Sequence, residues 1–131
     1  MMYLPDNVKI IICHRDPRDS WADIIGDKVW YSKYGMPLEA FIAGRKNTEN
    51  CVNYNSDKIM HVQFEEFCLK HEEYRKKILE FVGLSENETL ATKKFFDPKI
   101  SGKNIGIYKN IENKEAILKI EQELKEYCFY N

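Results

Sequence analysis

The chain has 131 residues, of which 44% are hydrophobic and 13% aromatic, so it is long enough for one domain and too apolar to be disordered. Lysine and arginine together number 20 against 21 acidic residues, and the net charge of −1 predicts no broad affinity for nucleic acid or membrane surfaces. No apolar stretch approaches the ~20 residues of a membrane-spanning helix. The first residues lack the pattern of a signal peptide, which favours a cytoplasmic protein.

The cysteines are scattered along the chain, at Cys13, Cys51, Cys68 and Cys128. None forms a Cys-x-x-Cys pair or a Cys/His cluster with metal-ligand spacing, so we expect reduced thiols and no metal site.

Residues 8–13 form an apolar run that is interrupted only by Lys9. The run lacks the alternation of a half-exposed strand, which predicts a central parallel strand buried on both faces. Helix-start signals follow at once, with Asp16 as the N-cap, Pro17 at the first helical position and Asp19 three residues after the cap. We expect this helix to extend from Pro17 to about Ile25.

The rest of the chain predicts one more strand and several helices. We expect a short helix over residues 38–46, a polar loop over 47–57, a strand over 59–64, a helix over 70–82 that Gly83 ends, a capping box at 85–88, a loop over 97–110 and a last helix over 113–127. This order predicts an α/β fold in a single domain, residues 1–131.

The predicted strand at residues 8–13 lacks enough neighbours. A strand buried on both faces needs a strand on each side, and the sequence offers only residues 59–64 with comparable strength. Either weaker segments at 50–54 or 106–109 form edge strands, or another chain completes the sheet, or this chain is part of a larger domain.

The junction between the first strand and helix carries two arginines. Ligands of open α/β sheets collect at the carboxyl ends of parallel strands, where helix N-termini present free N–H groups, and Arg15 lies there with Arg18 close by. A guanidinium fork suits a phosphate or sulfate. The alternative is a capped turn in which Arg15 pairs with Asp16 or Asp19.

Three segments together resemble one enzyme family. The motif Arg-Asp-Pro-Arg-Asp at residues 15–19 resembles the 3′-phosphate signature of the sulfotransferases that use 3′-phosphoadenosine 5′-phosphosulfate (PAPS). Residues 62–67, which precede a helix ending in Phe-Val-Gly-Leu at 81–84, are similar to the family's strand and Tyr-Glu-Asp-Leu motif. Residues 101–110 resemble its nucleotide-closing loop.

The resemblance implies a partial P-loop-type three-layer fold with an incomplete sheet, equivalent to the C-terminal half of such an enzyme. It implies transfer of a sulfuryl group from PAPS, without a metal, to a hydroxyl or amine of a carbohydrate or small molecule. The family's phosphosulfate loop and its usual base lie upstream of these motifs. The resemblance places the nucleotide against Arg15, Arg18, Phe64, Ser101, Gly102 and Lys103.

The sequence departs from the family pattern at two of these motifs. Asp23 stands where the family has a serine that shares the 3′-phosphate, and a carboxylate there repels a phosphate and removes a donor. Phe64 replaces a tyrosine, which keeps a surface for a purine and loses the hydroxyl.

Several other residues leave alternatives open. His14 lies next to Arg15 and either reaches a substrate as a base or, as we expect, packs beside the following helix. Four aromatic residues have two alternative roles, which are to line a cleft for the acceptor substrate or, as we expect, to pack in the core or a lid: Trp30, Tyr31, Tyr34 and Phe41. The function alternatives are a sulfotransferase, a non-catalytic nucleotide- or anion-binding subunit, and half of a P-loop-type kinase. In each case a homo-oligomer or a missing N-terminal segment is an alternative way to complete the sheet.

Overall fold

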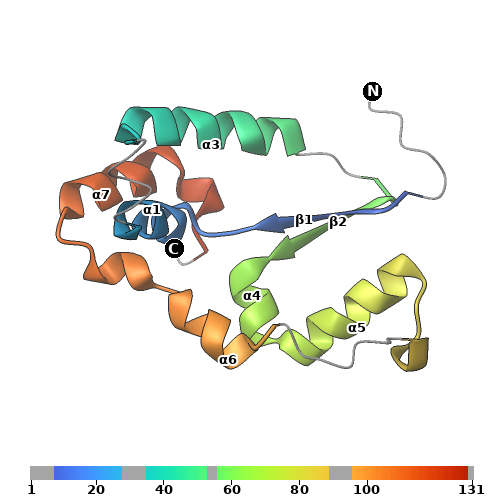
Figure 1. Ribbon diagram of the computed structural model, residues 1–131. Helices are drawn as coiled ribbons and strands as arrows, with labels where there is room; N and C mark the ends of the chain where they lie inside the picture. The colour runs from blue at the N-terminus through green and yellow to red at the C-terminus, as the bar shows by residue number, and fades with distance from the viewer. Residues whose placement is uncertain (1–7, 28–34, 53–55, 89–95, 130–131) are drawn as a thin grey trace. The chain divides into compact units, whose positions relative to one another are not determined.

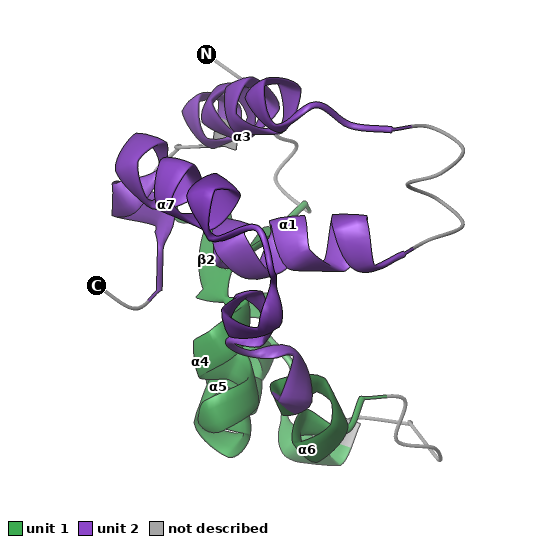
Figure 2. Ribbon diagram, turned by 90° about the vertical axis from the view of Figure 1, so that its left-hand side faces the viewer, with its two compact units in different colours: residues 1–14, 54–102 green, residues 15–53, 103–131 purple. Residues whose placement is uncertain are grey.

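The computed structural model describes residues 8–27, 35–52, 56–88 and 96–129 (Figure 1). These residues form two compact units, which are coloured separately in Figure 2: unit 1 is residues 1–14 and 54–102, and unit 2 is residues 15–53 and 103–131. The described residues contain six α-helices and one parallel two-stranded sheet, which confirms the α/β class. None of the described helices is long and apolar enough to cross a membrane.

Unit 1 contains the sheet. Strand β1 (Ile10–His14) pairs in parallel with β2 (Ile59–Gln63), with Ile10 opposite Ile59 and His14 opposite Gln63. The two strands lie side by side in Figure 1 and point in the same direction. Both predicted strands are therefore confirmed, and so is their parallel arrangement.

The prediction that β1 is buried on both faces is wrong for this chain. Ile11 is 42% exposed and Cys13 is also exposed. Among the described residues no third strand joins the sheet, because residues 50–52 end a helix and residues 107–110 form a 3-10 helix instead of edge strands. The apolar run thus forms a strand, but no described residue covers the face of β1 that carries Ile11 and Cys13.

Short helices complete unit 1. Helix α4 (Phe64–Leu69) follows β2 without a loop and contacts both α5 (His71–Val82) and α6 (Pro98–Ser101). Gly83 ends α5 in the left-handed conformation at φ 77°, as its position predicts. The predicted capping box at 85–88 contains a 3-10 turn, η1 (Glu86–Glu88), and the residues after it, 89–95, lie outside the described part of the chain.

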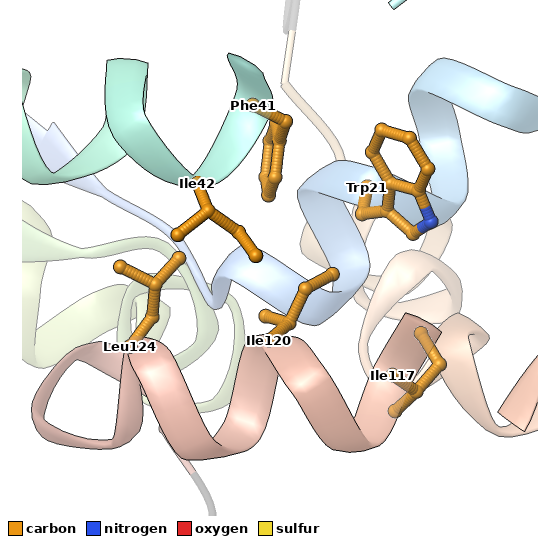
Figure 3. Close-up of a cluster of buried hydrophobic side chains, with 6 residues drawn as sticks. All are labelled: Trp21, Phe41, Ile42, Ile117, Ile120 and Leu124. Carbon is orange, nitrogen blue, oxygen red and sulfur yellow. The ribbon is translucent and has the colours of Figure 1, made fainter. Parts of the chain in front are cut away.

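Unit 2 packs three helices around an apolar cluster. They are α1 (Pro17–Gly26), α3 (Leu38–Val52) and α7 (Lys114–Glu123), and η4 (Lys125–Tyr127) follows α7. In Figure 3, Ile42 of α3 points toward Ile120 of α7 and toward Leu124, which follows that helix. The cluster consists of Trp21, Phe41, Ile42, Ile117, Ile120 and Leu124. The predicted apolar face of the last helix is therefore confirmed, although the α-helix itself ends at Glu123.

Helix α3 is longer than predicted, because residues 47–52 are helical and not part of a loop. The Thr48 hydroxyl donates to the Gly44 carbonyl at 3.0 Å, and Arg45 pairs with the buried Glu49 at 3.0 Å. The i,i+4 ion pair of Arg45 and Glu49 supports this last part of the helix.

Candidate anion site at the strand-helix junction

The first turn of α1 is capped as its sequence predicts. The Asp16 carboxylate accepts a hydrogen bond from the Arg18 backbone N–H at 2.8 Å, and Pro17 takes the first helical position. Asp16 is buried and also accepts the Phe129 N–H at 3.0 Å. The capped turn is thus part of the interior of unit 2.

Arg18 is held inside unit 2. Its guanidinium donates to both oxygens of Asp16, at 3.0 and 2.6 Å, and to Glu121 at 2.6 Å, and it lies 4.2 Å from the centre of the Tyr108 ring. Burial opposes its charge, but the bonds to the two carboxylates raise its pKa overall. With 3% of its surface exposed, Arg18 has a structural role, and this closed network does not favour the expected contact with a phosphate.

Asp19 joins two of the three motif segments. Its carboxylate accepts the backbone N–H groups of Gly106 at 2.7 Å and Tyr108 at 3.1 Å. Burial raises the pKa of Asp19, and the two backbone hydrogen bonds oppose that shift. Gly106 has a φ of 79°, a conformation that favours glycine. The start of α1 and the segment at 104–108, which belong to the first and third motifs, therefore lie together within unit 2.

Arg15, the first residue of unit 2, reaches the same segment. One guanidinium nitrogen donates to Asp23, and another donates to the Asn104 carbonyl at 3.2 Å. The side chains of Arg15 and Asp23 are 23% and 46% exposed. Asp23 is a partner that the sequence alternative did not name, and the charge of Arg15 also opposes the burial-driven rise of the Asp19 pKa.

The other residues expected to contact a nucleotide lie along unit 1 and at the start of the loop. Phe64 is the half-buried first residue of α4. Ser101 ends α6, which packs against α4, and Gly102 begins the next turn, η2 (Gly102–Asn104). Lys103, in unit 2, is exposed. Arg15 and the segment at 104–108 are thus brought together, whereas Phe64, Ser101 and Gly102 belong to unit 1.

The structure pairs two histidines that the sequence did not connect. His14 Nε2 lies 2.8 Å from His61 Nδ1, so His14 contacts a neighbouring strand within unit 1. The signal that was missed is the occurrence of histidine near the carboxyl ends of two parallel neighbouring strands.

Two further predictions concern the aromatic residues and metals. Trp30, Tyr31 and Tyr34 lie outside the described residues, and Phe41 packs in the core as expected. In the described ranges there is no group of three or more His, Cys, Asp or Glu side chains placed to hold a metal ion.

Comparison of the chain with protein-family models, with curated proteins and with solved structures finds no match. The likeness to sulfotransferases therefore depends on the three motifs, and membership of that family stays a prediction.

Proposed function

We propose that this chain forms the C-terminal part of a PAPS-dependent sulfotransferase, acting on a hydroxyl or amine of a carbohydrate or small molecule. The observation that supports the proposal most is the connection between the first and third motifs. Asp19 holds the Gly106 and Tyr108 N–H groups, and Arg15 reaches the Asn104 carbonyl. Two segments that resemble nucleotide-binding motifs and lie 87 residues apart in sequence are thus adjacent in unit 2.

The proposed ligand contacts follow the chemistry of these positions. Arg15 follows a parallel strand and precedes α1, and its guanidinium would stabilise a 3′-phosphate. Lys103, which is exposed in unit 2, adds a positive charge. The family resemblance also implies nucleotide contacts at Phe64, Ser101 and Gly102, which belong to unit 1. No metal is needed in this proposal.

A second segment or chain completes the sheet in this proposal. The exposed Ile11 of β1 supports it, because an apolar strand side chain is stabilised when a neighbouring element covers it. That segment would also supply the phosphosulfate loop and the base, so this chain alone is not expected to be catalytically competent. We propose a cytoplasmic location, and no nucleic-acid or membrane partner.

Calorimetry with adenosine 3′,5′-bisphosphate tests the nucleotide site. The chain should bind the bisphosphate, Arg15→Ala should remove the binding, and Arg75→Ala should leave it unchanged. Arg75 is a matched control because it is a surface arginine of α5 that also pairs with a carboxylate, Glu86, at 3.6 Å. Failure of the folded wild-type chain to bind, or equal binding by Arg15→Ala, would overturn the proposal.

A non-catalytic anion- or nucleotide-binding subunit is the second candidate. It is favoured by the pairing of Arg15 with Asp23, since the carboxylate already neutralises the arginine on which the phosphate contact depends. Sulfuryl transfer from PAPS by the chain together with its sheet-completing segment supports the enzyme. Binding of the nucleotide without transfer by that assembly supports the second candidate.

A further inference from the structure

We propose that His14 and His61 form a binding site for a divalent transition-metal ion of the Cu²⁺ or Ni²⁺ type, with His14 Nε2 and His61 Nδ1 as its two protein ligands. This site lies entirely within unit 1 and does not depend on the proposed function.

The strand register places both imidazoles on one face of the sheet. His61 lies opposite Ile12, and His14 lies two residues further along β1, so their side chains leave the same face. Their nitrogens are 2.8 Å apart, with 23° between the ring planes. Cys13 belongs to the opposite face, because side chains alternate along a strand.

The spacing of the two nitrogens suits particular coordination geometries. With metal–nitrogen bonds of about 2.0 Å, ligands in adjacent positions of a square or octahedral ion are about 2.8 Å apart, whereas tetrahedral ligands are about 3.3 Å apart. The nitrogens of His14 and His61 have the shorter spacing. In the hydrogen bond the two nitrogens point at each other, so binding an ion requires both rings to turn until the nitrogens occupy adjacent positions about 2.8 Å apart, and the proton between them is released to water.

The surroundings of His61 give an ion access from solvent. His61 is exposed and lines a shallow depression of about 530 Å³ together with Asp57, Lys77 and Glu80. The charges of Asp57 and Glu80 are balanced by Lys77 and by Lys9, whose ammonium lies 5.0 Å from the Phe81 ring of the same depression, so the depression supplies access and not electrostatic attraction. Because the described residues provide no third protein ligand, water fills the remaining positions and the ion is exchangeable.

Titration of the tag-free, metal-stripped protein with Ni²⁺ alone, followed by calorimetry, tests the site. The wild type should bind one ion per chain. His61→Gln, at an exposed position, should weaken the binding at least tenfold, and His14→Gln should have the same effect. In parallel, the electron paramagnetic resonance spectrum of bound Cu²⁺ should show coupling to nitrogen that both variants lose.

His71→Gln is the matched control, since His71 belongs to the same unit and packs between Phe67 and Phe96. It should bind Ni²⁺ as the wild type does. The proposal is overturned if the wild type binds no Ni²⁺, if the His61 variant binds as tightly as the wild type, or if the His71 variant loses binding equally. Circular dichroism of each variant establishes that it is folded.

Discussion

The guanidinium of Arg15, which precedes α1, donates to the carboxylate of Asp23, which lies on that helix eight residues further along the chain. The same guanidinium reaches the carbonyl of Asn104. A phosphate that binds Arg15 therefore meets a carboxylate already in contact with the guanidinium, and the affinity of the site for an anion depends on Asp23 as much as on Arg15.

Replacement of Asp23 by serine is expected to strengthen the binding of adenosine 3′,5′-bisphosphate about tenfold. The change removes a negative charge beside the phosphate and supplies a hydroxyl donor, and the two effects together are worth on the order of 1.4 kcal/mol. Calorimetry measures the change. Asp27→Ser is the control, because it removes the same charge from an exposed residue one turn later and should alter the affinity little. Equal gains in the two variants would contradict a specific role for Asp23.

Replacement of Asp19 by alanine is expected to lower the free energy of unfolding by about 2 kcal/mol. The change leaves the N–H groups of Gly106 and Tyr108 without their acceptor, and a part-buried donor that loses its partner costs about 1–3 kcal/mol. Denaturant unfolding measures the difference. Asp23→Ala, at a more exposed carboxylate of the same helix, should cost less than 1 kcal/mol.

The effect of Asp19→Ala should also depend on pH. Burial raises the pKa of Asp19, so the folded chain holds this proton more tightly than the unfolded chain does. The resulting stabilisation is complete below the ordinary aspartate pKa of about 3.9 and is lost as the pH rises through the raised value. The difference in unfolding free energy between wild type and variant should therefore shrink from pH 4 toward pH 7. A difference that grows over this range would contradict the direction of the shift.

Replacement of Arg18 by alanine is expected to destabilise the chain by about 3–5 kcal/mol. It leaves the buried Asp16 without its charged partner, and breaking a buried ion pair from one side has a cost of that size. Thermal or denaturant unfolding checks it, with Arg75→Ala as the exposed control. A loss below 1 kcal/mol would show that Arg18 does not hold the interior of unit 2 together.

The thiols should separate into a fast and a slow pair when labelled with a disulfide reagent at pH 8. Cys13 and Cys51 are exposed, whereas Cys68 and Cys128 are buried. Burial also raises the pKa of Cys128 to about 11, which keeps it in the unreactive thiol form. Denaturant should release the slow pair, and Cys51→Ser should remove one fast equivalent. Four equally fast thiols would contradict the described burial.

Local signals in the sequence predicted the elements whose residues interact within one segment. The Asp16 cap, Pro17 and Gly83 act within a few residues, and the spacing of Ile117, Ile120 and Leu124 marks a helix face. These features could therefore be read before the fold was known.

Contacts between distant segments could not be predicted in the same way. The partner of Arg15 depends on the helical position of Asp23, and the role of Asp19 depends on a segment 87 residues away. The burial of β1 was overestimated because the strand's own sequence shows only that its side chains are apolar. Whether they are buried depends on other elements packing against them, which the strand's sequence does not specify.

The central claim, a 3′-phosphate site at Arg15, is tested most directly by comparing two ligands on two proteins. Calorimetry gives the affinities of adenosine 3′,5′-bisphosphate and adenosine 5′-monophosphate for the wild type and for Arg15→Ala. If Arg15 binds the 3′-phosphate, the wild type should prefer the bisphosphate at least tenfold, and the variant should bind the bisphosphate no better than the monophosphate, with neither binding measurable. A wild type without this preference, or a variant that keeps it, would contradict the claim.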